Sequence, residues 1–159
     1  MKKRGVRLKR NRLFIILGIV WTILFAGMSF YWAIGGTIGV RSLGGSIYEM
    51  SLNPTTTFLV IVWMTGFVKL LGVLLLLLLL VRWQNTLMKK ILYYMTKTAG
   101  VFLFLYGFLN FITITLSAFH ILEFELDNYA TFWRLAFWEP YWMVGGVFYF
   151  FSVKRLPSL

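Results

Sequence analysis

Three polar side chains interrupt long apolar stretches of this sequence, and each is a candidate for ligand binding or proton transfer. Lys69 is the single charge between Phe58 and Val81, and Asn110 and Glu139 stand in two later apolar stretches. A charged side chain near the middle of a bilayer is costly in free energy unless it is paired or hydrated, so such residues mark functional sites by default. These three residues are therefore the first candidates for a binding site.

Counting along the helices predicts that the three polar residues lie at one depth. Lys69 and Asn110 are each 12 residues from the basic end of their apolar stretch, which is ~18 Å in an α-helix. Glu139 is 14 residues from the corresponding end, or ~21 Å. The three side chains could then meet inside a helix bundle, where Lys69 and Glu139 could form an ion pair.

Two interpretations of such a pair follow from the chemistry of buried charges. The pair could only hold the helices in register, as buried polar groups do in other helix bundles. It could instead bind a ligand or move a proton, which is a common use of ionisable groups inside a membrane. The sequence offers no second acid or histidine at this level to continue a proton relay, which favours the structural interpretation.

The dipeptide Glu139-Pro140 leaves two starts open for the last helix. Proline at the first helical position and an acid near the positive end of the helix dipole are typical of a helix that begins here. A helix over 139–153 would have 15 residues and a length of ~22 Å, too short to cross a bilayer unaided. A helix that begins near Thr131 and bends at Pro140 would be long enough, and it would bring Arg134 to the outer side, where it could meet an acid.

Four long apolar stretches must position these residues. The chain of 159 residues is 60% hydrophobic, and the stretch 58–81 has 24 residues. At ~36 Å, this stretch is long enough to cross the ~30 Å hydrocarbon core of a bilayer. The sequence therefore predicts a single all-α membrane domain, a bundle of four transmembrane helices. The expected helices cover about 13–33, 58–81, 91–118 and 131–153.

Basic residues indicate how these helices are oriented. Of the 16 Lys and Arg residues, 13 lie in the N-terminal tail 1–12, the connection 82–97 and the C-terminal tail, and none of the five acidic residues lies there. Basic residues accumulate on the cytoplasmic side of membrane proteins, so both termini are predicted to be cytoplasmic. The tail 1–12 is also expected to contact anionic lipid headgroups.

Several other chemistries lack the residues that they need. The chain has no cysteine and one histidine, so thiolate chemistry and sites built from several histidines are excluded. His120 with Glu123, Glu125 and Asp127 is a loosely spaced group, so neither a metal nor another cofactor is expected. The net charge of +11 does not indicate nucleic-acid binding, because the basic residues flank apolar stretches.

Two blocks of residues resemble an uncharacterised family of small bacterial membrane proteins with four helices. The first block closes the first helix as Tyr31-Trp32-Ala33-Ile34-Gly35-Gly36, similar to the Tyr-Trp-Ala-x-Gly-Gly signature of that family. The second block lies in the last helix and comprises Thr131, Phe132, Arg134, Leu135, Trp138, Pro140, Gly145 and Gly146. The resemblance implies a bacterial inner-membrane protein without an assigned activity, and it favours a last helix that begins before Trp138.

Three hypotheses of function follow. The first is a non-enzymatic membrane protein, either an accessory subunit of a membrane partner or a module that binds a lipid or other ligand, with homo-oligomers as a further option. The second is a small ion-coupled transporter that uses Lys69 and Glu139. The third is an enzyme that acts on a lipid, with Glu139 as acid or base and Arg134 or Arg41 on a headgroup phosphate.

Overall fold

The computed structural model describes residues 2–122 and 126–153, with side chains from residue 11 onward. The described chain is all-α, as the apolar stretches predict. Several residues behind the sequence-based expectations lie outside what is described. They are the basic side chains before Asn11, the acids Glu123 and Glu125, and the C-terminal Lys154 and Arg155.

The helical elements follow one another through short connections. They are α1 (Lys2–Ala33), η1 (Arg41–Leu43), α2 (Gly45–Leu52), α3 (Thr56–Leu78), α4 (Thr86–Ala118), α5 (Asn128–Trp133), η2 (Arg134–Trp138) and α6 (Glu139–Ser152). η1 is a short 3₁₀ turn and η2 is a π-helix, so α5, η2 and α6 form one continuous helical segment. Within the described part of the chain, three stretches are long and apolar enough to cross a membrane: 11–33, 56–78 and 86–118.

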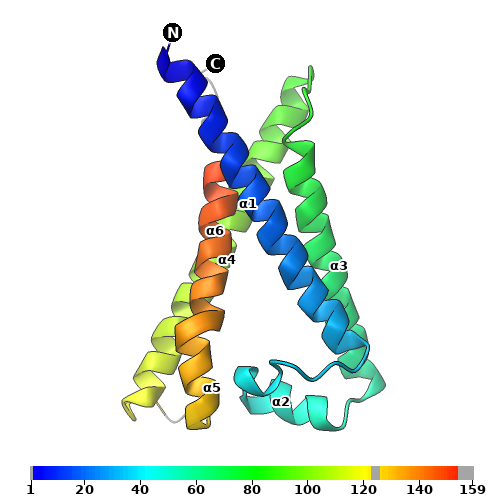
Figure 1. The fold of residues 1–159 in the computed structure, drawn as a ribbon, viewed down its shortest axis with the longest axis vertical. Helices are drawn as coiled ribbons and strands as arrows, with labels where there is room; N and C mark the ends of the chain where they lie inside the picture. Colours follow the sequence, from blue (N-terminus) through cyan, green and yellow to red (C-terminus); the bar gives the residue numbers. More distant parts are fainter. Residues whose placement is uncertain (1, 123–125, 154–159) are drawn as a thin grey trace.

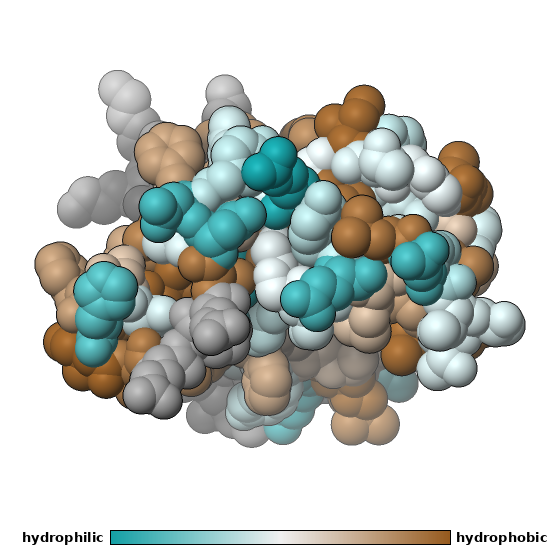
Figure 2. All heavy atoms as spheres, turned by 90° about the horizontal axis from the view of Figure 1, so that it is seen from below, coloured by the Kyte–Doolittle hydropathy of each residue, from teal (hydrophilic) through white to brown (hydrophobic). Residues whose placement is uncertain are grey.

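Two helix pairs form a wedge (Figure 1). The α4/α6 pair packs along one side, and the α1/α3 pair packs along the other. α1 also packs against α6, so the four long helices follow the spatial order α3, α1, α6, α4. α3 and α4 diverge from their short connection, and α2 lies across the wide end of the wedge (Figure 1). Hydrophilic and apolar side chains are interspersed on the surface at that end (Figure 2).

Polar side chains fix where three of the helices begin. Thr55 accepts a hydrogen bond from the backbone N–H of Phe58 at the start of α3. Asn85 does the same for Leu87 at the start of α4, and Asp127 accepts from Ala130 at the start of α5. Each cap satisfies a backbone donor that has no partner within its helix. α3 and α4 therefore begin at residues 56 and 86, before the positions 58 and 91 expected from hydropathy.

Glycines let α4 and α6 approach backbone to backbone. A Cβ atom at Gly146 would lie 2.6 Å from the backbone nitrogen of Phe104 and 2.7 Å from the carbonyl oxygen of Gly100. A Cβ atom at Gly107 would lie 2.7 Å from the carbonyl oxygen of Glu139. Helices in membranes often associate through such small residues, because little hydrophobic driving force acts between them. The α4/α6 contact is therefore specified at two levels along the pair.

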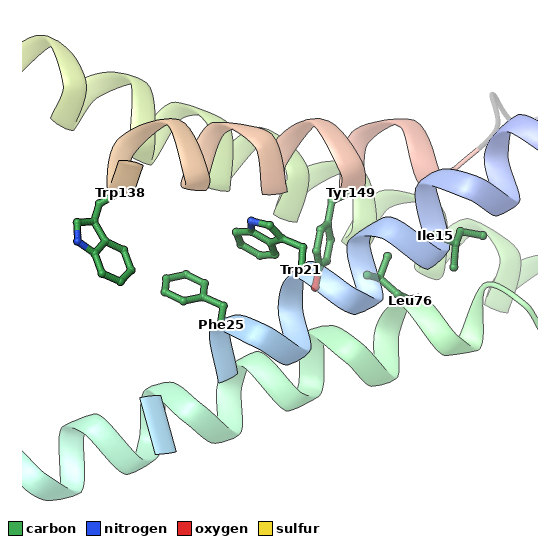
Figure 3. Packing of buried hydrophobic residues seen from close by; sticks show 6 residues of the cluster. All are labelled: Ile15, Trp21, Phe25, Leu76, Trp138 and Tyr149. Atoms are coloured by element: carbon green, nitrogen blue, oxygen red, sulfur yellow. The ribbon is translucent and has the colours of Figure 1, made fainter. Parts of the chain in front are cut away.

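Aromatic side chains join α1 to α6 at the narrow part of the wedge (Figure 3). Trp21 stacks on Tyr141 with ring centroids 5.0 Å apart. The indole N–H of Trp21 donates to the carbonyl oxygen of Tyr141 at 3.0 Å, and the Tyr141 hydroxyl donates to the carbonyl oxygen of Trp21 at 3.1 Å. Two reciprocal hydrogen bonds and a stacked ring pair thus connect the two helix pairs.

Candidate functional site

A cavity of about 630 Å³ lies in the wedge between the two helix pairs. Its walls come from α1, α3, α4 and the segment η2–α6, and residues of η1 and α2 line it at the wide end. Its volume falls within the range typical of small-molecule sites. Four of its lining residues carry a charge at neutral pH: Arg41, Lys69, Arg134 and Glu139.

Lys69 extends from α3 toward α1. Its ammonium donates a hydrogen bond to the hydroxyl of Ser29 at 2.9 Å and lies 4.3 Å from the centre of the Phe25 ring. A longer contact of 3.5 Å joins it to the carbonyl oxygen of Thr65, one turn earlier in α3. These partners are neutral, and no acidic side chain among the described residues pairs with Lys69.

Glu139 is held by Arg134 on the opposite wall. One carboxylate oxygen, Oε1, accepts hydrogen bonds from the guanidinium of Arg134 at 2.7 and 2.9 Å. Glu139 is 1% exposed, and its second oxygen, Oε2, is buried without a hydrogen-bond partner among the described residues. A buried charge pair of this kind is destabilising if one member is lost, because the other charge then remains buried and unpaired.

The π-helix η2 is what brings Arg134 and Glu139 to the same face. Five residues along a regular α-helix correspond to a rotation that leaves the two side chains about 140° apart. In η2 the backbone N–H of Glu139 donates to the carbonyl oxygen of Arg134, five residues earlier, so the two positions stack. Pro140 follows directly and has no N–H to give to a regular α-helical bond. The ion pair between Arg134 and Glu139 therefore depends on the π-helical turn.

The sequence-predicted site residues divide into two groups in the structure. Lys69, Arg134 and Glu139 line the cavity, and the helical segment begins at Asn128, well before Glu139-Pro140. The amide of Asn110 donates at 2.8 Å to the carbonyl oxygen of Tyr106 on its own helix, so it makes a local contact.

Lys69 and Glu139 do not form the ion pair that the sequence left possible, because each charge has another partner. Glu139 binds Arg134, and Lys69 binds Ser29. α1 packs against both α3, which carries Lys69, and α6, which carries Glu139. The ring of Phe25 contacts the Lys69 ammonium and lies 4.6 Å from the ring of Trp142 on α6. Hydropathy does not reveal Ser29 and Phe25 as the neighbours of Lys69, since both simply belong to an apolar helix.

The Tyr31-Trp32 motif forms a compact turn at the end of α1. The backbone N–H of Gly36 donates to the carbonyl oxygen of Tyr31, and a side chain at Gly36 would collide with the Tyr31 ring, 2.3 Å away. Gly35 has a φ of 95°, which favours glycine. The indole N–H of Trp32 donates to the carbonyl oxygen of Ile38 at 2.8 Å. These requirements explain the residue types in the motif.

The two sequence blocks meet beside the cavity. Trp32 and Trp138 lie with ring centroids 5.7 Å apart, and both line the cavity. The indole N–H of Trp138 donates to the hydroxyl of Ser42 in η1 at 2.8 Å. The motif at the end of α1 and the block around Pro140 thus build the same wall near the wide end.

Comparison with known proteins adds a family but no relative of known function. The family described as "Protein of unknown function (DUF3995)" matches residues 22–149, a range that contains every lining residue of the cavity. No curated protein and no solved structure matches the chain.

Proposed function

The chain belongs to the protein family of unknown function DUF3995, and we propose that it is an integral membrane protein that binds an amphiphilic ligand without catalysing a reaction. The observation that carries this proposal is the cavity of about 630 Å³ between the two helix pairs. Mostly apolar walls with a few polar groups are typical of ligand sites.

The membrane assignment rests on three long apolar helices. We propose that the continuous segment 128–152 is a fourth span, since its 25 residues would extend ~37 Å as a regular helix. With the basic tail 1–12 and the connection 82–97 on the cytoplasmic side, both termini are cytoplasmic and the wide end of the wedge faces outward. A bacterial cytoplasmic membrane is the setting that the Tyr-Trp-Ala-x-Gly-Gly resemblance implies.

The polar groups of the cavity favour binding over catalysis. One oxygen of the Glu139 carboxylate is engaged by Arg134 and the side chain is 1% exposed, whereas a general acid or base must reach a substrate proton. Lys69 is half-buried and hydrogen-bonded to Ser29. These groups are arranged to hold a ligand or to position one another. A role as an accessory subunit is compatible with this proposal, since the ligand could be bound jointly with a partner.

Purification of the full chain from its native membrane in mild detergent tests the proposal. Mass spectrometry of lipids, small molecules and proteins in the purified sample should find a stoichiometric small ligand. The variant Thr65→Trp places a bulky side chain in the cavity from α3, so this variant should no longer bind the small ligand. Val68→Trp adds the same bulk to an exposed position of the same helix and should keep it. A stoichiometric partner protein with no small ligand would instead establish an accessory subunit.

A small ion-coupled transporter is the second candidate. Lys69 and Glu139 line one cavity but belong to different helix pairs, and one oxygen of Glu139 has no partner among the described residues. A change in the angle between the pairs would alter the surroundings of both charges. Solute or proton flux into liposomes that is lost in Lys69→Ala would support a transport function. Flux that is the same in Lys69→Ala and the wild type would exclude a transporter that uses Lys69.

A further inference from the structure

We propose that the ligand of this cavity is an anionic amphiphile whose phosphate or carboxylate headgroup binds at Lys69 and Ser29. The inference rests on the proposed ligand-binding function and names the chemical class of the ligand. Its hydrocarbon chain leaves the cavity between α3 and α4 and lies in the bilayer.

The charge of the cavity wall selects an anion. Arg41, Lys69 and Arg134 are positive, and Glu139 is the single acid among the described lining residues. Glu139 is already neutralised by Arg134. Lys69 lies within the apolar span 56–78 and has only neutral partners among the described residues, so its charge is costly there. An anionic group would compensate that charge, whereas a cationic ligand would add to it.

Two hydrogen-bond donors converge at one place on the wall. Lys69 has three N–H groups, one of which binds Ser29, while a second makes the long contact to Thr65. Ser29 accepts from Lys69, so its own hydroxyl hydrogen remains available as a donor. A headgroup oxygen beside them would accept from the third N–H and from the Ser29 hydroxyl. Hydrogen bonds from a cation to an anionic oxygen are among the strongest in proteins.

The open side of the wedge gives the hydrocarbon chain a path. α3 and α4 diverge from their connection, and each packs mainly against a helix other than its neighbour in sequence, α3 against α1 and α4 against α6 (Figure 1). Side chains of α3 line the cavity on this side, and Tyr106 of α4 faces them across it. The apolar ones on α3 are Phe58, Leu59, Ile61 and Val62. A soluble anion would leave this apolar wall unused, which favours an amphiphile.

Arg41 adds a positive charge nearer the wide end. It lines the same cavity from η1, is exposed, and lies 5.0 Å from the centre of the Tyr129 ring. A second cation between the aqueous surface and Lys69 attracts anionic headgroups toward the deeper site.

Binding to the purified full chain in neutral detergent tests the inference. The probes are dioleoyl phosphatidylglycerol, oleate, dioleoyl phosphatidylcholine and inorganic phosphate, each carried through the same titration by tryptophan fluorescence and thermal stabilisation. Phosphatidylglycerol or oleate should bind, phosphatidylcholine should bind about tenfold more weakly, and inorganic phosphate should not bind.

Matched lysine variants assign the binding to Lys69. Lys69→Met should weaken binding of the anionic lipid by about tenfold and leave phosphatidylcholine unchanged. Lys97→Met is the control, since Lys97 is also half-buried and also packs on an aromatic ring, at 3.2 Å from the centre of Phe150, but is not a lining residue of the cavity. The affinity of the Lys97→Met variant for the anionic lipid should match that of the wild type.

The outcomes separate this inference from the function on which it rests. Equal affinity for neutral and anionic lipids, with Lys69→Met unchanged and Thr65→Trp defective, would overturn the anionic ligand and keep the binding function. Tight binding of inorganic phosphate alone would overturn the amphiphile and assign a soluble anion. Binding of every lipid that is indifferent to Thr65→Trp would overturn both proposals.

Discussion

The guanidinium of Arg134 lies 2.7 Å from Oε1 of Glu139, although the two residues are five positions apart in one helical segment. In a regular α-helix they would point in different directions, and the π-helix η2 brings them together. Irregular turns of this kind are frequent at functional sites. Here the turn lies in the wall of the cavity between the two helix pairs.

Loss of Arg134 should destabilise the protein strongly. Arg134→Met leaves the carboxylate of Glu139 buried and unpaired, at a cost of about 3 kcal/mol in the free energy of unfolding. The double variant Arg134→Met/Glu139→Gln should regain much of that loss. Unfolding in mixed detergent micelles measures both, with Arg82→Met, at an exposed position, as the control that should change little. Equal effects of Arg134→Met and Arg82→Met would show that the ion pair is unimportant.

Changes at Lys69 and Glu139 should be additive. The two side chains have separate partners, Ser29 and Arg134, so each variant removes contacts that the other does not share. A double-mutant cycle with Lys69→Met and Glu139→Gln should give a coupling free energy below about 0.5 kcal/mol. A larger coupling would mean that the two charges interact across the cavity.

Gly146→Ala should weaken the α4/α6 pair. The added methyl group would meet the backbone of Phe104 and Gly100, which cannot move aside as a flexible side chain can. We expect a loss of about 1–3 kcal/mol in the free energy of unfolding. Gly27→Ala is the matched control, because nothing lies within 4 Å of a Cβ atom at that position of α1. It should be neutral or stabilise the helix by up to about 1 kcal/mol, and a similar loss in both variants would contradict the close packing.

The hydrogen bond between Tyr149 and Thr22 should respond unequally to loss of its two partners. The Thr22 hydroxyl donates to the carbonyl oxygen of Gly18, so the Tyr149 hydroxyl is the donor in their 3.0 Å bond. Tyr149→Phe leaves Thr22 satisfied and should cost about 1 kcal/mol. Thr22→Val leaves the buried Tyr149 hydroxyl unpaired and should cost more, about 1–3 kcal/mol. Unfolding measurements that reversed this order would assign the donor to Thr22.

The orientation of the chain can be tested directly, since the protein has no cysteine of its own. Single cysteines at Ser51, Asn85 and Val153 mark α2, the connection after α3 and the end of α6. In intact cells a membrane-impermeant maleimide should label position 51 only. Positions 85 and 153 should react after permeabilisation. Labelling of position 153 in intact cells would mean that the segment 128–152 does not cross the membrane.

Local sequence patterns predicted the helices better than their contacts. The apolar stretch around Lys69 is a helix because no residue within it interrupts the apolar pattern. This helix begins directly after the Thr55 cap, two residues before the predicted start. Counting residues brought Lys69 and Glu139 to the same cavity but could not show which groups lie between them. That depends on how each helix is rotated and on which neighbour it packs against, and Lys69 contacts Ser29 and Phe25 of α1. Asn110 illustrates the same limit, because its depth said nothing about its bond to Tyr106.

The partner of Glu139 was hidden for a second reason. Pairs on a helix surface are expected three or four positions apart, so Arg134 and Glu139 do not form an obvious pair in the sequence. A π-helix brings side chains five positions apart onto one face. A single sequence gives little signal for a π-helix beyond the Pro140 that follows it. The charge of Arg134 suggested that it could meet an acid, but regular helix geometry does not point to Glu139 as that acid.

The spatial order α3, α1, α6, α4 also determines at which point of its synthesis the protein can form the cavity. α1 and α3 leave the ribosome before α4 and can pack against each other at once, whereas α4 must wait for α6, which follows it in the sequence. Until α6 docks on α1, Lys69 can contact Ser29, but the opposite wall of the cavity is missing. A nascent chain that stops before residue 139 therefore contains two packed long helices and an unpartnered third one, and the cavity is complete only once α6 has been made.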